Sequence, residues 1–365
     1  MSASLRVLVV DDSAYNRRTI SELLESLPGV EVAGKAADGD EALRMATELR
    51  PDLITLDLEM PRMDGFTFLR LLMARQPTPV IVVSGYSAKE NVFRALELGA
   101  LDFVAKPSRT VSSDLGQIRA ELAEKVELVK HLSPASIDPR RRGSSFSSGR
   151  TATQVFRTVD ASGKLSATPS TDEPRWVVVV GASTGGPTAL LELFAAFDPS
   201  PPAAVVVAQH MPEKFTRTFA SRLDRLGKLR IAEASDVSRL SAGQGAICPG
   251  GRCIEVTRTA GVLVTKVVPA ASDDRYAPSA DRLFESAAVT CGERVIAVVL
   301  TGMGDDGARG VVAVKNAGGV VLAEAPETAV IYGMPGAAVR TGAVDRSLSL
   351  RELAAQVVAL ATREN

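Results

Sequence analysis

The stretch VVVVGASTGGP, residues 177–187, joins four consecutive valines to a glycine-rich turn that carries a serine. An apolar helical pattern, PTALLELFAAF, follows at residues 187–197. A buried strand, a tight turn and a helix in this order are typical of an open parallel α/β sheet. The turn has the G-x-S-x-G spacing of a nucleophile elbow, formed by Gly181, Ser183 and Gly185. It has neither the G-x-G-x-x-G spacing of a dinucleotide loop nor the Gly-Lys-Ser/Thr ending of a P-loop.

The same alternation of short apolar runs and helices extends from Arg175 to the C-terminus. The clearest strand patterns there are WVVVVGAS, AAVVVAQH, RVIAVVLTG and GVVLAEA. Such runs predict a parallel sheet covered by helices on both faces. In open α/β sheets, sites gather at the carboxyl ends of the strands, so the residues that follow these runs are the candidate site.

The first half of the chain repeats this organisation between Leu5 and Leu132. Its strand patterns are RVLVV, DLITL, PVIVV and DFVA, separated by amphipathic helical patterns and closed by the helix QIRAELAEKVELVKHL. Between the halves, residues 133–174 are rich in Ser, Thr, Arg, Gly and Pro, the composition of a flexible linker. We therefore predict two doubly wound parallel-sheet α/β domains, at residues 1–132 and 175–365.

The composition limits the class of protein. Of 365 residues, 45% are apolar and 23% are charged, which is typical of a soluble globular protein. The net charge of -1 gives no cationic field to gather nucleic acid or anionic lipid. The start, MSASLRVLVVDD, is not a signal peptide, and no apolar run approaches the roughly 20 residues of a membrane span. We expect a cytoplasmic protein with no nucleic-acid partner and no membrane insertion.

The cysteines support a reducing compartment. There are three, Cys248, Cys253 and Cys291, and they show no paired framework. The segment CPGGRC brings two of them close in sequence, but no histidine or further cysteine lies nearby. A zinc site is therefore not expected.

Polar residues follow the strands of the first half. Asp11 and Asp12 follow the first strand, and Asp57, Ser84 and Lys106 lie at the ends of later ones. Parallel strands bring these ends to one edge of the sheet, where three carboxylates would repel one another without a cation. Oxygen ligands suit Mg²⁺, and Asp57 could attack a phosphoryl group whose charge Lys106 offsets. The alternative, that polar residues merely terminate strands, does not account for five of them at corresponding ends.

The first half resembles the receiver domain of bacterial response regulators over nearly its whole length. The motifs VLVVDDS, DLITLDLEMPRMDG, VIVVSGYS and GALDFVAKP match in order and spacing. The resemblance implies a flavodoxin-like fold in which a histidine kinase phosphorylates Asp57. It implies a Mg²⁺ site formed by Asp11, Asp12 and Asp57. It also implies that Ser84 and Lys106 contact the phosphoryl group, that Phe103 is an aromatic switch, and that the Lys106–Pro107 bond is cis.

In the second half, a serine hydroxyl at position 183 needs a base to become nucleophilic. The chain has two histidines. His131 lies beside the linker and is most simply a surface residue. His210 follows the strand AAVVVAQ and so comes to the same sheet edge as Ser183, although a histidine there could also be a helix cap or core residue.

A third group should be a carboxylate that orients the imidazole. The glycine-rich turn in RVIAVVLTGMGDDG supplies Asp305 and Asp306, between which spacing does not choose. A turn rich in Asp and Gly is also common without a catalytic role. The order Ser, His, Asp differs from the Ser, Asp, His order of α/β-hydrolases, which indicates a different sheet topology.

The second half resembles the catalytic domain of the chemotaxis protein-glutamate methylesterases, the CheB family, from about Arg175 to the C-terminus. The motifs GASTGGP, QHMP, LTGMGDDG and YGMP match in order. The resemblance implies a Rossmann-like domain with a Ser183, His210, Asp306 triad and Met303 beside the site. The backbone N–H of Thr184, which follows the nucleophile, is the natural oxyanion donor.

Three segments depart from the family pattern. Cys253 and Tyr276 stand where the family commonly has histidine, and residues 323–325 read AEA in place of A-Q-D. We expect these departures to lie away from the triad and to affect receptor recognition only.

The predicted protein is a phosphorylation-activated serine esterase. By resemblance, it hydrolyses glutamate γ-methyl esters on chemoreceptors with release of methanol, and it deamidates receptor glutamines. The expected partners are the chemoreceptors and a chemotaxis histidine kinase, and the expected oligomeric state is a monomer. The esterase domain needs no cofactor.

Three alternatives belong to other classes. A transcription factor would need a basic recognition element, and residues 175–365 show no such cluster. A nucleotide-binding domain is disfavoured by the missing glycine spacings. A catalytically inactive receptor adaptor would have no need to keep Ser183, His210 and Asp306 together.

Overall fold

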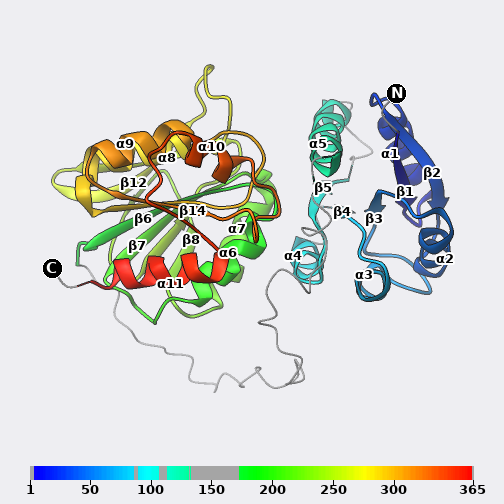
Figure 1. Ribbon diagram of the computed structural model, residues 1–365, viewed down its shortest axis with the longest axis horizontal. Helices are drawn as coiled ribbons and strands as arrows, with labels where there is room; N and C mark the ends of the chain where they lie inside the picture. The colour runs from blue at the N-terminus through cyan, green and yellow to red at the C-terminus, as the bar shows by residue number, and fades with distance from the viewer. Residues whose placement is uncertain (1–3, 86–88, 107–112, 131, 133–171, 364–365) are drawn as a thin grey trace.

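The computed structural model describes residues 4–85, 89–106, 113–130, 132 and 172–363. These residues form two α/β domains, each built on its own parallel sheet (Figure 1). The predicted fold class is thereby confirmed. Nearly all of the expected linker, His131 and the Lys106–Pro107 bond lie outside the described residues, so the domain boundaries and the cis bond stay predictions.

The first domain has a five-stranded sheet in the order β2-β1-β3-β4-β5, with all neighbours parallel. Its strands are β1 (Leu5–Val10), β2 (Val30–Ala36), β3 (Leu53–Leu56), β4 (Val80–Ser84) and β5 (Asp102–Ala105). Its helices are α1 (Ala14–Glu25), α2 (Gly39–Leu49), α3 (Gly65–Arg75), α4 (Lys89–Glu97) and α5 (Ser113–Lys130). This strand order is the flavodoxin-like one.

Local chemistry sets several of these boundaries. The side chains of Ser13, Asp38 and Asp64 accept hydrogen bonds from backbone N–H groups in the first turns of α1, α2 and α3. Such caps satisfy donors that a helix N-terminus leaves free. Strand β2 is an edge strand that pairs only with β1. It carries the exposed charged residues Glu31 and Lys35, so it lacks the continuous apolar run that identified the other strands.

The second domain has a seven-stranded sheet in the order β15-β14-β13-β6-β7-β10-β8, and every pairing is parallel. Its strands are β6 (Trp176–Ala182), β7 (Ala203–Gln209), β8 (Arg230–Glu233), β10 (Gln244–Ile247), β13 (Val295–Val299), β14 (Val320–Glu324) and β15 (Arg346–Leu348). Its helices are α6 (Gly186–Ala195), α7 (Glu213–Asp224), α8 (Ala280–Cys291), α9 (Ala308–Asn316), α10 (Met334–Arg340) and α11 (Leu350–Ala361), with a 3-10 turn at Gly292–Arg294.

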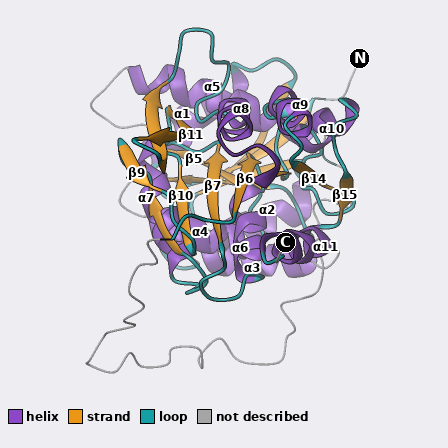
Figure 2. Ribbon diagram, turned by 90° about the vertical axis from the view of Figure 1, so that its left-hand side faces the viewer, coloured by secondary structure: helices purple, strands orange, loops and turns teal. Residues whose placement is uncertain are grey.

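The valine run of the central strand β6 is buried on both faces of this sheet. Val178 and Val180 belong to the core that includes residues of α6 and α11, whereas Val177 and Val179 belong to the core that includes residues of α8 and α9. Figure 2 shows these helix pairs on opposite sides of the sheet. The continuous apolar run therefore reflects two-sided burial, as expected for a parallel sheet.

A small antiparallel sheet in the order β11-β12-β9 was not anticipated. It consists of β9 (Val237–Arg239), β11 (Arg252–Thr259) and β12 (Val262–Pro269). The β11–β12 hairpin turns at Ala260 and Gly261, whose φ angles are 49° and 81°. Two successive residues in the left-handed region form the tight turn that fits the twist of a hairpin.

The two domains contact each other through aromatic residues. Phe93 of α4 stacks on Phe219 of α7 with ring centroids 5.4 Å apart, and Phe103 of β5 lies 4.5 Å from Phe215 of α7. Figure 1 shows α4 and α5 on the side of the first domain that faces α6 and α7. All four rings are buried. The first domain thus covers the helix that directly follows His210.

None of the helices among the described residues is both long and apolar enough to cross a bilayer.

Candidate active site

Two of the predicted catalytic residues lie at the carboxyl edge of the seven-stranded sheet, at the ends of neighbouring strands. Ser183 follows β6 and His210 follows β7. The backbone N–H of His210 donates to Ala182 O at 2.9 Å, so the parallel pairing continues up to the two side chains. The fold thus brings together residues that are 27 positions apart in the sequence.

The turn around Ser183 depends on glycine. Gly185 has a φ of 79°, a left-handed conformation that favours glycine, and it caps the start of α6. Gly302 approaches the serine so closely that a Cβ there would lie 2.7 Å from Ser183 Cβ. The glycine-rich segments after β6 and β13 therefore serve the close approach of two loops.

Among the predicted catalytic groups, Asp306 contacts the imidazole. Its Oδ2 lies 2.8 Å from His210 Nε2, and Asp306 is buried. Asp305 is instead largely exposed and accepts from both Arg275 and Tyr276. The contact with His210 therefore favours Asp306 over Asp305, as the family resemblance does.

Asp306 is surrounded by donors at the start of α8. Its carboxylate accepts from Ala280 N at 2.7 Å, Asp281 N at 3.0 Å and Ser279 Oγ at 3.3 Å. Burial by itself would raise the pKa of Asp306, but the hydrogen bond and charge of His210, with the N–H groups of Ala280 and Asp281, hold that pKa below its usual value. An ionised Asp306 can orient the imidazole and stabilise the imidazolium.

The ring nitrogen left for Ser183 is Nδ1, because Nε2 is engaged by Asp306. Within the described residues, Ser183 Oγ makes no hydrogen bond to His210. Catalytic hydrogen bonds often form only when substrate binds, so the missing bond is compatible with a nucleophile and its base.

Tyr276 corrects one expectation from the sequence. Its ring stacks on His210 with centroids 5.1 Å apart and planes 13° from parallel, and its hydroxyl donates to Asp305 Oδ1 at 2.9 Å. The prediction that the departures from the family pattern lie away from the triad is therefore wrong for Tyr276. Cys253 is buried, and its thiol lies 3.7 Å from Asp274 Oδ2.

The AEA segment also connects to the site. Glu324, its central residue, is buried and accepts from Thr301 N at 2.8 Å. The carbonyl of Thr301 in turn accepts from Ser183 N at 3.0 Å. The AEA segment is thus connected to the backbone of Ser183 through a single residue, Thr301.

Gln209 is a site residue that the sequence analysis missed. Its Nε2 donates to the backbone carbonyls of Ser183 and His210, each at 2.9 Å, and the side chain is buried. One amide thereby joins the two catalytic segments. The only sequence signal is its place directly before His210, which by itself predicts a buried strand residue.

Thr184 lies at the contact between the domains. Its hydroxyl donates to Asp102 Oδ2 at 2.5 Å and lies 3.2 Å from Lys125 Nζ, and those two residues form an ion pair within the first domain. The backbone N–H of Thr184 has no hydrogen-bond acceptor among the described residues, as an oxyanion donor requires. Met303 packs beside Val330 against the apolar cluster of α1 and α5.

The first domain gathers its predicted carboxylates at the edge of its own sheet. Ligand atoms of Asp11, Asp12 and Asp57 all lie within 4.8 Å of one another. Lys106 Nζ lies 2.6 Å from Asp57 Oδ2 and 3.0 Å from Asp11 Oδ2. Ser84 is buried at the end of β4.

This cluster has the properties of a site for a hard cation. Asp11 Oδ2 is buried and accepts no hydrogen bond despite its distance to Lys106, and Asp12 is exposed. Burial raises the pKa of Asp57, against the opposing effect of Lys106. Oxygen donors of this number and charge fit Mg²⁺.

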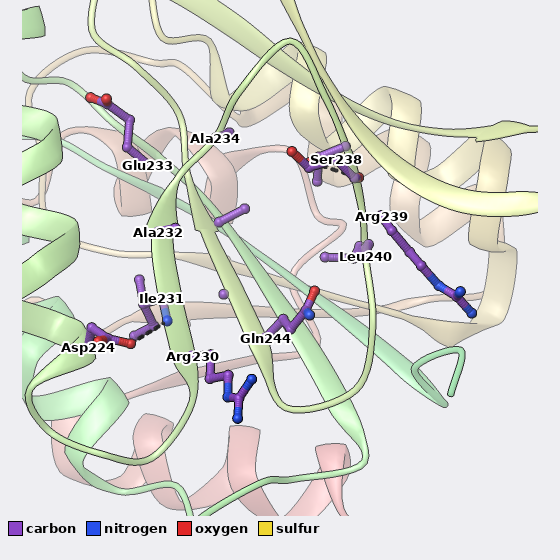
Figure 3. A pocket seen from close by; sticks show the side chains of 13 residues that line it. Asp224, Arg230, Ile231, Ala232, Glu233, Ala234, Ser238, Arg239, Leu240 and Gln244 are labelled. Atoms are coloured by element: carbon purple, nitrogen blue, oxygen red, sulfur yellow. Dashed lines mark hydrogen bonds between the residues drawn. The ribbon is translucent and has the colours of Figure 1, made fainter. Parts of the chain in front are cut away.

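A separate cavity of about 530 Å³ lies between β8, β9 and β10 (Figure 3). Its lining includes Arg230, Ser238 and Gln244, and beside it Asp224 accepts from Ile231 N at 2.8 Å. None of the predicted site residues lines it. The candidate active site is therefore identified by the geometry of its side chains, not by the size of a cavity.

Comparisons with known families agree with the two domains. A family model described as CheB methylesterase matches residues 178–357, and one described as response regulator receiver domain matches residues 7–113. A protein-glutamate methylesterase/protein-glutamine glutaminase from Geobacter sulfurreducens is 49% identical over 97% of this chain and 96% of its own length. A namesake from Anaeromyxobacter dehalogenans is 51% identical over 98% of this chain and 96% of its own.

Two solved structures are similar to the separate halves. The crystal structure of the Thermotoga maritima CheB methylesterase catalytic domain is 34% identical, covers 51% of this chain and 98% of its own, and has a TM-score of 0.49. The response regulator domain of Thermotoga maritima CheB is 41% identical, covers 36% of this chain and 99% of its own, and has a TM-score of 0.34.

Proposed function

This chain belongs to the family of protein-glutamate methylesterases/protein-glutamine glutaminases that carry a receiver domain, and from that premise we propose that Ser183 hydrolyses glutamate γ-methyl esters on the cytoplasmic helices of chemoreceptors. The observation that carries the assignment of roles is the contact of His210 Nε2 with the buried Asp306, beside the strand that ends at Ser183. The family is one of hydrolases, and the proposal assigns the catalytic residues, the receptor substrate and the control by phosphorylation.

In the proposed reaction, Ser183 Oγ attacks the ester carbonyl while His210 Nδ1 accepts the hydroxyl proton. The Thr184 N–H donates to the oxyanion of the tetrahedral intermediate. The intermediate collapses, the C–O bond to methoxide breaks, and the imidazolium returns its proton to release methanol. Water then attacks the acyl-enzyme by the same route, giving glutamate and free Ser183.

Deamidation of receptor glutamines follows the same steps with a different leaving group. The C–N bond of the tetrahedral intermediate breaks, and His210 delivers the proton that lets ammonia depart. Hydrolysis of the acyl-enzyme again leaves glutamate. Both reactions use the same serine, base and oxyanion donor.

The receiver domain is proposed to block this site until it is phosphorylated. Asp102 and Lys125 contact the hydroxyl of Thr184, the residue after the nucleophile. Release of the receiver would uncover Ser183 and Thr184, both of which are buried in the described state. A modification that stabilises the released state shifts the population towards active enzyme.

Asp57 is the proposed phosphorylation site, with a chemotaxis histidine kinase as phosphodonor. Asp11, Asp12 and Asp57 would hold Mg²⁺, which when bound offsets negative charge on phosphoryl oxygens. Ser84 and Lys106 would contact the phosphoryl group. Phe103, the proposed switch, packs on Phe215 of the esterase domain, so a change in its rotamer would alter the domain contact directly.

Methanol release from methylated receptor membranes tests this function. We expect release by the intact protein to disappear with Ser183→Ala. A small phosphodonor should stimulate the intact protein but not Asp57→Ala. No release by the intact protein under any condition, although it binds the membranes, would favour the adaptor function instead.

A further inference from the structure

One face of α7 begins beside the catalytic base and extends away from it. Helix α7 starts three residues after His210, and Phe215, Phe219, Arg222 and the C-cap residue Arg225 follow at spacings that place them on one side of the helix. From Glu213 to the cap, twelve residues at about 1.5 Å each span about 18 Å. We call these four residues the α7 face. It combines apolar rings with two cations.

The receiver covers the α7 face with a helix of complementary chemistry. Phe93 of α4 stacks on Phe219, Glu97 accepts from Arg222 Nε at 3.2 Å, and Glu90 accepts from Arg225 at 3.3 Å. Glu90, Phe93 and Glu97 lie at i, i+3 and i+7, which places them on one side of α4. The side of α4 that covers the α7 face in this state therefore combines a phenylalanine with two glutamates, although α4 as a whole is electrically balanced because it also carries Lys89 and Arg94.

The two ion pairs between α4 and α7 are weak enough for another acidic partner to take the place of α4. Side-chain exposure is 19% for Arg222 and 38% for Glu97, and it is 65% for Arg225 and 54% for Glu90. The Arg225–Glu90 pair is exposed on both sides, so water and salt weaken it, whereas Arg222 is more buried than its partner Glu97. When the receiver moves away, the α7 face is left with two unneutralised arginines and two phenylalanines next to the active site.

We propose that the freed α7 face docks a substrate helix that presents glutamates and apolar side chains on one side, and that α4 of the receiver occupies this docking surface until the receiver is released. The inference rests on the proposed function, in which the substrate is a helical receptor segment bearing glutamates. A helix seated where α4 lies can reach both the arginines and, at the other end of α7, the region of His210. Release of the receiver then exposes the docking surface and the catalytic serine at the same time.

The test separates docking of the receiver from docking of the substrate. Full-length protein with a small phosphodonor is assayed on methylated receptor membranes and on p-nitrophenyl acetate, a small ester that needs no docking surface. For Arg222→Glu we expect the KM for receptors to rise about fivefold, which corresponds to a like-charge contact in place of an ion pair. The kcat on receptors and the rate on the small ester should stay unchanged.

The matched control is Glu97→Arg, which breaks the same ion pair from the receiver side. It should raise basal activity on both esters without raising the receptor KM of the activated enzyme. The double variant Glu97→Arg with Arg222→Glu should restore low basal activity yet keep the raised KM. Higher ionic strength should raise the receptor KM of the wild type more than that of Arg222→Glu, since salt screens the pairing.

Two outcomes would overturn the inference. If the activated Arg222→Glu enzyme has the receptor KM of the wild type, the arginine serves the receiver alone. If the wild type cleaves the small ester but no receptor ester, the proposed substrate is wrong and the docking inference fails with it. Should Arg222→Glu lose small-ester activity, the more exposed Arg225→Glu replaces it, with the same expected rise in KM.

Discussion

Asp57 in the receiver and Asp306 in the esterase domain occupy equivalent places yet have opposite electrostatics. Each lies at the carboxyl edge of a parallel sheet, and their exposures are 4% and 1%. Burial raises the pKa of Asp57, while the donors around Asp306 more than offset burial and lower its pKa. Asp57 accepts one backbone N–H, from Glu59, and forms an ion pair with Lys106, whereas Asp306 accepts two backbone N–H groups and contacts His210.

The difference corresponds to different roles. The esterase carboxylate is already fully surrounded by donors, so its charge is fixed in position before substrate arrives, as preorganised catalysis requires. The receiver carboxylates are crowded, because ligand atoms of Asp11, Asp12 and Asp57 lie within 4.8 Å of one another and Lys106 pairs with both Asp11 and Asp57. Such a cluster is stabilised by an added cation and is suited to respond to an input.

The largest expected effect comes from removing the charge of Asp306. Asp306→Asn should lower kcat by about 10³- to 10⁴-fold, because the imidazole loses its oriented tautomer and the imidazolium its partner. The matched control, Asp305→Asn, should change kcat less than about threefold, because Asp305 contacts Arg275 and Tyr276 instead of His210. Methanol release rates measure both, and equal losses in the two variants would mean that the carboxylates were assigned wrongly.

A substitution of Gln209 should show how much catalysis depends on the hydrogen bonds that hold the backbones of Ser183 and His210. Gln209→Met removes both donors to the carbonyls of Ser183 and His210, so we expect kcat to fall about 10- to 100-fold with KM unchanged. Gln244→Met, in the separate cavity, is the control and should leave kcat unaffected. A Gln209 variant with normal kcat would show that the strands alone align the two segments.

The receiver site should respond to pH through its metal. If Asp11, Asp12 and Asp57 hold Mg²⁺ as proposed, the metal requires their ionised carboxylates, and because burial raises the pKa of Asp57, protonation competes with the metal at higher pH than for a free aspartate. Calorimetric titration of the full chain should give weaker Mg²⁺ binding at pH 5.5 than at pH 8. Asp12→Asn should weaken binding at both values. Affinity independent of pH would contradict the role of Asp57 as a ligand.

The smallest effect expected is a gain in stability from neutralising Asp57. Because its folded pKa is raised, the ionised form is less stable folded than unfolded, and this loss sets in as pH rises past the unfolded value. Without Mg²⁺ at pH 7, Asp57→Asn should therefore slow hydrogen exchange in β1 and β3, because the relief of burying the charge outweighs the lost pair with Lys106, and the gain should vanish near pH 4. Asp306, with its lowered pKa, should behave oppositely: it stabilises above the unfolded value, and that contribution fades as pH falls through its folded pKa. Destabilisation by Asp57→Asn would contradict the proposed contrast.

Apolar runs predicted most of the fold. Strands such as β6 and β7 are buried on both faces and are continuous in sequence, so their pattern is strong. The edge strand β2 and the antiparallel hairpin β11–β12 contain polar or charged residues among their apolar ones and are only partly buried, so none of them is a continuous buried apolar run. Their weaker pattern explains why they were missed.

The positions of residues at strand ends predicted which catalytic candidates lie near one another. They did not predict the hydrogen bonds and ring contacts that these residues make with other segments. Spacing left Asp305 and Asp306 open, and only the resemblance and the contact with His210 separate them. The stacking of Tyr276 on the imidazole and the two bonds of Gln209 join segments distant in sequence, so no local pattern reveals them.

The central claim is that the receiver controls access to a nucleophilic Ser183, and serine labelling tests it most directly. A fluorophosphonate probe would be added to the full-length protein with and without a small phosphodonor, and intact mass spectrometry would follow the labelling rate. We expect one label on Ser183, formed faster with phosphodonor in the wild type and at a rate that the phosphodonor leaves unchanged in Asp57→Ala. Labelling at another residue, or a rate that the phosphodonor leaves unchanged in the wild type, would contradict it.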